Sequence, residues 1–454
     1  MTPEVRDRID QIRQGIVPEG YKKTKSGILP ESWSVRTIAE CLERVEHPVE
    51  VQANEMYTQI GIRSHGKGLF YKEPVTGDSL GNKSVFWIEP DCFILNIVFA
   101  WEQAVGKTTQ AEAGMIGSHR FPMYRPINGS IDIDYLISYL LTKRGTDILE
   151  AASPGGAGRN RTLGQDRFMK SRIVLPPLDE QKKIAEILST QDKAIELQER
   201  KIEELKRFKK GCLEKMFPRK GQKVPETRFP GFTGDWEQRK VSTIASDTRG
   251  GGTPATSNET YWSGNIPWIQ SSDLSEGKLF GVEPRKYISR DGLNNSATQL
   301  VPENSIAVVT RVGVGKLAFM PFSYTTSQDF LSLCKLQTEP HFTVYALYQM
   351  LQGELQAVQG TSIKGMTKDD LLSKSIFAPK DEVEQQQLGS YFRNLDTLIT
   401  LHQRKLGAIN LTNAIVLFDN GYNPVSACEF IILKGVLTYA KHHYQKRHVI
   451  LRLL

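Results

Sequence analysis

The chain repeats itself at an offset of about two hundred residues, and this feature constrains its fold more than any other. The segment LPESW ending at Trp33 has a counterpart, FTGDW, ending at Trp236. RIVLPPLDEQ over 172–181 corresponds to KSIFAPKDE over 374–382. The strongest internal match is between DKAIELQERK (192–201) and DTLITLHQRK (396–405), which are identical at five of ten positions. Offsets that vary only between 202 and 204 indicate a tandem duplication of one unit.

The first part of each unit, about 150 residues long, is predicted to be a mixed α/β globule. Short apolar runs rich in β-branched and aromatic residues are separated by glycine and proline, which is typical of strands and turns. We expect strands over these runs: 84–88, 93–99, 306–310 and 317–320. Helical spacing of apolar residues over 131–141 and 344–351 adds helices to the globules.

The second part of each unit is predicted to be a long helix with a coiled-coil seam. It follows Pro176-Pro177, which suits the entry to a helix rather than its interior. A 3.5-residue period kept from 184 to 216 favours supercoiled pairing, and a helix over 179–216 would span roughly 57 Å. The predicted seam positions are Ile184, Leu188, Ile195, Ile202, Leu205, Cys212 and Met216, with Gln191, Gln198 and Lys209 between them, and in the second copy Leu388, Phe392, Leu395, Ile399, His402, Leu406 and Ile409.

These patterns predict an α/β (α+β) fold in which two tandem globules are separated by long helices that pair as an antiparallel coiled coil. The alternative is that each helix packs only on its own globule. The predicted ranges are an N-terminal helical segment (1–24), a first globule (25–177), a first long helix (178–217), a second globule (218–380), a second helix (381–420) that degenerates after 406, and an atypical tail (421–454).

Composition excludes several classes of protein. The 454 residues include five scattered cysteines, too few and too far apart for a disulfide framework or a C-x-x-C zinc site, and we expect a reducing, cytoplasmic location. The polar start lacks the apolar run of a secretory signal. The longest apolar stretch, 92–101, is half the roughly 20 residues that span a bilayer, so we expect no membrane insertion. A net charge of +7 permits an anionic partner.

No motif predicts an active site. An Asn-Pro-Pro-Tyr string for adenine methylation is absent, and the histidines of the globules lack metal-ligand spacing. The sequence Gly313-Val-Gly-Lys316 lacks the spacing of a phosphate loop and is better explained as a tight turn between two strands. Gly155-Gly-Ala-Gly158 is too compressed for a dinucleotide fold. The residues Asp179-Glu-Gln-Lys182 resemble a nuclease cluster, but acidic residues are expected in the first turn of a helix. We therefore predict a protein without metal or catalytic residues.

The chain resembles the specificity (S) subunits of type I DNA restriction-modification systems. The resemblance covers residues 15 to about 406 and rests on PPLDEQKKIAEIL (176–188), LEKMF (213–217), RFPGFTGDW (228–236), GGTPATSN (251–258) and YWSGNIPW (261–268). It implies a non-catalytic subunit whose globules are target recognition domains, each reading one half of a bipartite asymmetric DNA site. The helices would fix the spacing of the two domains and dock the methyltransferase (M) subunits.

The resemblance also implies that DNA contact comes from basic and polar side chains of the globules. Arginine and lysine pair with guanine, and glutamine with adenine, in the DNA major groove, although most such side chains contact phosphate or remain solvated surface charges. The candidate DNA-binding residues are Arg63, His65, Lys67, Lys83, Arg120, Arg125, Arg159 and Arg161 in the first globule and Gln270, Ser271, Arg311, Lys316, Gln328 and Lys364 in the second.

The resemblance also implies the partners. They would be double-stranded DNA, two M subunits and the restriction/translocase (R) subunits, with no membrane. The chain itself would hold no cofactor, because S-adenosylmethionine, ATP and magnesium are expected on the partner subunits.

The chain departs from this family after Leu406. The repeat projects the first-helix segment 205–217 to about residue 421, but from 407 to 440 the only charged residues are Asp419, Glu429 and Lys434. This change suggests a frame-shifted or rearranged variant whose second helix pairs only partly and leaves part of the first seam, Ile184 to Met216, exposed. Three alternatives stay open: an inactive variant that sequesters M subunits, a sequence-independent DNA-bridging protein, and a nuclease or helicase with an unrecognised site.

Overall fold

The computed structural model of the chain describes residues 3–155, 161–219, 221–357 and 365–418, with side chains up to Ile409 in the last segment. The chain divides into two compact units. The first is built from the residues up to Gln198 together with the chain from Lys405 on, and the second from Glu199 to Arg404. Each unit therefore contains one globule and parts of both long helices, and each is described by itself.

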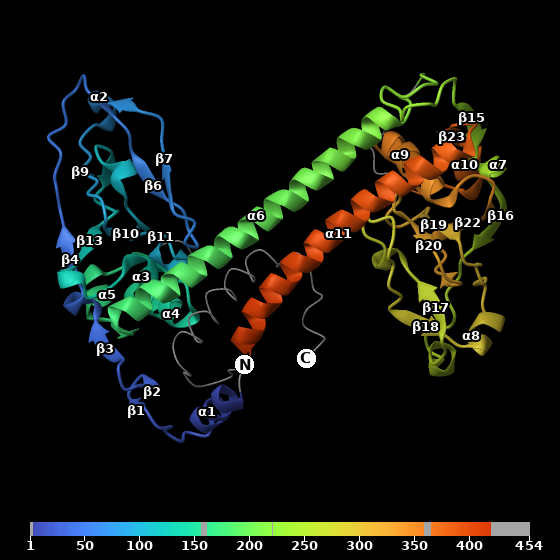
Figure 1. Ribbon diagram of the computed structural model, residues 1–454. Helices are drawn as coiled ribbons and strands as arrows, with labels where there is room; N and C mark the ends of the chain where they lie inside the picture. Colours follow the sequence, from blue (N-terminus) through green and yellow to red (C-terminus); the bar gives the residue numbers. More distant parts are fainter. Residues whose placement is uncertain (1–2, 156–160, 220, 358–364, 419–454) are drawn as a thin grey trace. The chain divides into compact units, whose positions relative to one another are not determined.

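The first unit combines short antiparallel sheets with small helices, and α3, α4 and α5 contribute to its largest apolar core. Its largest sheet has the strand order β11-β10-β13-β4, and α3 packs against β11 while α4 packs against α3 and α5 (Figure 1). Trp33, Phe93, Tyr124 and Phe168 are fully buried in the core, where Phe93 and Phe168 stack with ring centroids 6.2 Å apart. The elements are α1 (Pro3–Arg13), β1 (Tyr21–Thr24), β2 (Gly27–Pro30), β3 (Ser34–Thr37), β4 (Leu42–Val45), β5 (Met56–Tyr57), β6 (Ile60–Ile62), β7 (Leu69–Tyr71), β8 (Val75–Thr76), α2 (Gly77–Leu80), β9 (Val85–Trp87), β10 (Phe93–Leu95), β11 (Val105–Lys107), β12 (Ile116–Ser118), β13 (Met123–Pro126), α3 (Ile133–Leu140), α4 (Lys143–Ala152), α5 (Gln165–Lys170) and β14 (Arg172–Leu175).

The second unit is organised around the antiparallel sheet β16-β22-β19-β20, with the smaller sheet β18-β17-β21 beside it (Figure 1). Helix α9 packs against β20 and β23. Strand β19 is buried at all five positions, as expected for a central strand covered on both faces. The elements are β15 (Glu237–Lys240), α7 (Val241–Ile244), β16 (Ala245–Gly250), β17 (Ile266–Ile269), β18 (Lys286–Ile288), α8 (Arg290–Asn294), β19 (Ser305–Val309), β20 (Leu317–Met320), β21 (Thr325–Thr326), β22 (Phe330–Leu336), α9 (Pro340–Ala357), α10 (Lys368–Ser373) and β23 (Ser375–Ala378).

The duplication seen in the sequence is present in the strand pairing. In the first unit β3 pairs antiparallel with β14, so that Ser34 faces Leu175. In the second unit β15 pairs with β23 in the same way, and Glu237 faces Ala378. Ser34 and Glu237 are separated by the same number of residues as Trp33 and Trp236, and so are Leu175 and Ala378. Each tryptophan precedes the first strand of its pair and is almost completely buried.

A buried glutamine fastens the start of each long helix to its globule. Gln181 accepts a hydrogen bond from the Asp132 backbone N–H at 2.9 Å and donates to the Pro176 carbonyl at 2.9 Å. Gln385 accepts from the Glu339 N–H and donates to the Pro379 carbonyl, both at 2.9 Å. Burial excludes water from these backbone groups, so the side chain must satisfy them.

The two long helices are α6 (Leu178–Met216) and α11 (Glu382–Phe418), and most of the predicted seam residues are buried. Within the second unit they run antiparallel, because Lys209 contacts Asp396 while the later residue Cys212 contacts the earlier residue Tyr391. The buried seam residues are Ile184, Leu188, Ile195, Ile202, Leu205, Met216, Leu388, Phe392 and Ile399, whereas Leu395 and Leu406 are half-buried.

The backbone of α11 stays helical to Phe418, beyond the composition change after 406. The structure corrects two expectations. The strand expected over 93–99 ends at Leu95, because the carboxamide of Asn96 accepts from the Val98 N–H at 3.0 Å and turns the chain. The expected exposure of the first seam is wrong at its described positions, since Ile184 and Leu188 belong to the core of the first unit and Met216 to that of the second. Both ends of the first seam are therefore buried by packing of α6 on the globules, as in the alternative in which each helix packs on its globule.

Asp192 is the repeat counterpart of Asp396, but no described residue forms an ion pair with it. The Asp192 side chain is exposed, yet partial desolvation by its surroundings raises its pKa to about 6. An unfolded aspartate titrates near pH 4, so the folded chain binds the proton more tightly and loses stability as pH rises from about 4 to about 6.

We therefore expect Asp192→Asn to leave the melting temperature unchanged at pH 4 and to raise it by about 1–3 °C at pH 7. Scanning calorimetry at both pH values measures this, with Glu186→Gln on the same helix as the control for the altered net charge. A difference from wild type that is the same at both pH values would contradict the assignment.

Candidate nucleic-acid interface

The Trp101 loop, residues 96–103 after β10, brings several candidate residues of the first globule together. Ile97 donates its N–H to the Arg120 carbonyl at 3.0 Å, and its own carbonyl accepts from Leu163, two residues beyond Arg161, at 2.8 Å. The β6–β7 hairpin docks on the other end of the loop. There the His65 N–H donates to the Glu102 carbonyl at 2.8 Å. The loop therefore places Arg120, Arg161 and the hairpin residues around one centre.

The Trp101 loop is held rigidly by polar contacts. The side chain of Gln103 donates to the Thr146 hydroxyl of α4 at 2.6 Å, and Ser64 donates to the Glu102 carboxylate at 2.9 Å. Gln103 and His65 both have left-handed backbone conformations. For non-glycine residues such conformations persist where the surroundings fix them.

Two arginines of this cluster lie over aromatic rings. The Arg161 guanidinium lies 5.5 Å from the ring centroid of Trp101, and that of Arg63 lies 5.1 Å from the centroid of Phe70. Arg63 also donates to the Leu69 carbonyl at 2.7 Å. Cation–π contact fixes the direction of a guanidinium while leaving its edge available. Lys67, at the hairpin tip, and Arg120 are exposed.

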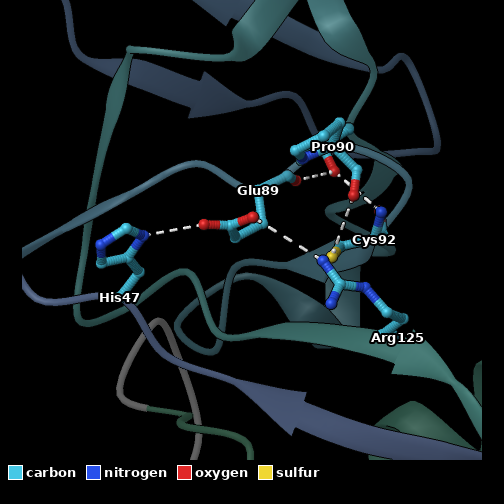
Figure 2. Close-up of polar contacts among 6 residues, drawn as sticks. His47, Glu89, Pro90, Cys92 and Arg125 are labelled. Carbon is cyan, nitrogen blue, oxygen red and sulfur yellow. Dashed lines mark hydrogen bonds and ion pairs between the residues drawn. The ribbon is translucent and has the colours of Figure 1, made fainter.

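Elements other than the Trp101 loop hold Lys83 and Arg125. Lys83 precedes Ser84, whose carbonyl accepts from the His119 N–H at 3.3 Å, so it lies toward Arg120 at the β9–β12 end. Arg125, on β13, faces Glu89 with 3.7 Å between Nη2 and Oε2 (Figure 2). The other oxygen of Glu89 lies 2.8 Å from Nδ1 of His47.

The polar cluster around Glu89 is part of the fold. The Cys92 N–H donates to the Thr108 hydroxyl at 2.9 Å, and that hydroxyl donates to the Glu89 carbonyl at 2.6 Å. The Cys92 thiol lies beside Arg125 (Figure 2), and burial raises its pKa against the opposing effect of that arginine. A buried thiol of this kind is protonated and unreactive.

In the second globule hydrogen bonds bring all five described candidates together at adjoining ends of the two sheets. The Ser327 N–H donates to the Ile269 carbonyl at 2.9 Å, which places Gln328 beside Gln270. Lys316 donates from Nζ to the Ser271 carbonyl at 3.3 Å. Arg311 follows Thr310, whose N–H donates to the Asp329 carbonyl at 2.7 Å.

These five side chains differ in how free they are to meet a ligand. Arg311 and Gln328 are exposed, whereas Gln270, Ser271 and Lys316 are half-buried. Gln328 accepts a hydrogen bond from the Thr253 hydroxyl at 2.8 Å, which orients its amide. The Gly313–Lys316 segment forms the predicted tight turn between β19 and β20. Both of its glycines have positive φ, at 91° and 95°.

Two candidates, Arg159 and Lys364, lie outside the described residues. Lys364 precedes the segment in which the Met366 N–H donates to the Thr310 carbonyl at 2.7 Å. Sequence reasoning missed Trp101, Phe70 and Val312 as surface residues of these clusters. For Val312, the sequence signal that could have revealed it is the alternation of valine and glycine over residues 312–315.

Within the described part of the chain, no group of three or more metal-ligating side chains comes together. None of the described helices is both long and apolar enough to cross a membrane. What the geometry offers is two separate clusters of basic and amide side chains on rigid loops, one in each unit. Such clusters suit phosphate and base-edge contacts.

Comparison with known proteins agrees with this geometry. Residues 85–207 and 233–411 match the family described as type I restriction modification DNA specificity domain. A putative type I restriction enzyme MjaX specificity subunit from Methanocaldococcus jannaschii is 23% identical over 412 residues, which cover 85% of this chain and 92% of that protein. The EcoR124I/EcoR124II specificity subunit from Escherichia coli is 30% identical over 162 residues, or 33% of this chain and 38% of that one.

A solved S subunit of a type I restriction-modification system from M. genitalium has a similar fold. The TM-score is 0.53 at 12% sequence identity, and the superposition covers 89% of this chain and 96% of that one. The similarity extends over both globules and the long helices, which confirms the mixed α/β fold with tandem globular domains.

Proposed function

This chain belongs to the type I restriction modification DNA specificity domain family, and from that premise we propose that each of its globules reads one half of a bipartite, asymmetric DNA site. Membership makes it a DNA specificity subunit of a type I restriction-modification system, a subunit that is not itself catalytic. The reading domains in this proposal are residues 25–177 and 218–380.

The observation that carries the proposal is that each unit gathers most of its described candidate side chains on one set of loops. The frames that hold these loops are equivalent, as the β3–β14 and β15–β23 pairs show. The loops themselves differ: the first cluster is rich in arginine and aromatic rings, and the second in glutamine, arginine and lysine. Two domains with equivalent strand pairs but different side chains on their loops require two different DNA half-sites.

The long helices set the gap between the half-sites in this proposal. A helix of 39 residues extends for roughly 58 Å, and its repeated seam resists bending because successive seam residues pack in register. The separation of two readers must match the DNA repeat, so one gap length is favoured. We propose that the outer faces of the same helices dock two M subunits, and that R subunits join this assembly. S-adenosylmethionine, ATP and magnesium would be held by these partners.

Co-expression of the chain with its M subunits, followed by genome-wide mapping of methylated adenines, tests the proposal. We expect one motif with two unlike specific parts and a constant gap of unspecified bases. A chain that binds M subunits but yields no methylation would instead be the sequestering variant. Binding to all DNA alike, with a steep salt dependence, would identify a bridging protein.

Removing basic side chains of the first cluster should weaken binding of DNA that carries the first half-site. We expect Lys67→Ala and Arg63→Ala each to raise the dissociation constant of the M–S complex by about 5- to 30-fold, the loss of one charge-assisted contact. Fluorescence anisotropy at fixed salt measures this.

Lys170→Ala, at an exposed position of α5 in the same globule, is the matched control and should change the dissociation constant by less than twofold. Unchanged binding by Lys67→Ala and Arg63→Ala would remove both residues from the first reader.

A further inference from the structure

We propose that Val312 reads a thymine by contacting its C5-methyl group in the half-site bound by the second globule. This inference rests on the proposed function and adds a specificity-determining residue to it. The residue lies in the Arg311 loop, defined as residues 310–316 between β19 and β20.

Val312 is unusually exposed for an apolar residue. Its relative exposure is 69%, above that of every other exposed large hydrophobic residue among those the structure describes. Valine is not a turn-forming residue, because its branched side chain restricts the backbone, and glycine, asparagine or aspartate would serve a simple turn better. Local structure therefore gives no reason for a valine at the tip of this loop.

The loop that carries Val312 is fixed at its base. The Val309 N–H donates to the Lys316 carbonyl at 2.9 Å, and the Thr310 N–H and hydroxyl both donate to the Asp329 carbonyl, at 2.7 and 3.1 Å. Gly315 lies so close to α9 that a Cβ there would be 2.4 Å from Cδ1 of Leu355. A loop with such supports presents its apolar tip in one place, which lowers the entropy lost on binding.

The surroundings of Val312 define the chemistry of its partner. Arg311 is exposed next to it, Lys316 closes the loop, and Gln328 lies beside the Asp329 carbonyl that anchors Thr310. An exposed apolar residue on a loop that also carries cationic residues, with an amide residue at its base, matches a surface that is anionic but contains one methyl group. In the DNA major groove that group is the C5-methyl of thymine.

The test replaces each thymine of the mapped site, one at a time, with deoxyuridine, which removes only the methyl group. We expect one such replacement, in the half-site read by the second globule, to weaken binding by the wild-type M–S complex about fourfold, the effect of one buried methyl group. The same replacement should leave the affinity of the Val312→Ala complex unchanged. Val224→Ala removes an equally apolar, 42% exposed side chain from the segment between α6 and β15, and that variant should respond to deoxyuridine as wild type does.

The outcomes separate the two proposals. If the wild-type complex prefers its mapped site but no deoxyuridine duplex distinguishes wild type from Val312→Ala, the assignment of Val312 is wrong while the proposed function stands. If the wild-type complex has no preferred site, both are overturned.

Discussion

Replacing Arg228 with methionine should lower the free energy of unfolding of the second unit by about 3–5 kcal/mol, because it leaves a buried carboxylate without its cation. Nε and Nη2 of Arg228 contact the two oxygens of Glu384 at 2.6 and 2.7 Å, and Nη1 donates to the Gly234 carbonyl at 2.7 Å. The Glu384 side chain is only 1% exposed. This pair joins the segment before Trp236 to the first turn of α11.

Chemical denaturation at pH 7 measures the effect of Arg228→Met. Arg219→Met is the matched control, since it breaks an exposed ion pair with Glu226 and should cost less than about 1 kcal/mol. The double variant Arg228→Met/Glu384→Gln should recover part of the loss, because a neutral amide costs less to bury than a lone carboxylate. A loss below 1 kcal/mol in Arg228→Met would show that the pair does not hold this junction.

Replacing Lys209 with methionine should destabilise the paired helices of the second unit by about 3 kcal/mol. Nζ of Lys209 lies 2.6 Å from Oδ1 of Asp396, and the Tyr345 hydroxyl donates to Oδ2 at 2.5 Å. The two charged side chains are 10% and 21% exposed. Without its cation, the largely buried Asp396 carboxylate is left uncompensated, which is the source of the expected loss.

Thermal melts of Lys209→Met at pH 7 measure this deficit. Lys206→Met, which breaks an exposed pair with Glu203 on the same helix, should change the melting temperature by less than about 1 °C. Equal deficits for the two variants would contradict a special role of the Lys209–Asp396 pair.

The repeat, the long helices and the buried seam were predictable from the sequence because each leaves a periodic trace. The offset between Trp33 and Trp236 recurs in the strand pairs, and the 3.5-residue spacing from Ile184 to Met216 appears as a buried stripe. The turn at Gly313–Lys316 was predictable from its glycines. The spacing of the seam residues and the glycines of the turn depend only on neighbouring residues, and the repeat is visible when the sequence is compared with itself.

The binding clusters were predictable only in part, because contacts between distant segments assemble them. Gln270, Ser271, Arg311, Lys316 and Gln328 were named from composition and do come together, but nothing local indicates that the Ile269–Ser327 and Thr310–Asp329 hydrogen bonds join them. Trp101 was missed because its apolar run reads as a strand until the Asn96 carboxamide turns the chain. Arg228 and Glu384 form their pair across more than 150 residues.

The central claim is that two different readers act at one fixed separation, and the affinity of the M–S complex for duplexes of altered gap tests it most directly. Duplexes carry both mapped half-sites with the gap shortened or lengthened by one base pair, which shifts one half-site by about 3.4 Å and rotates it around the DNA axis. We predict at least a tenfold loss of affinity for either change. Equal affinity for all three gap lengths would contradict the account.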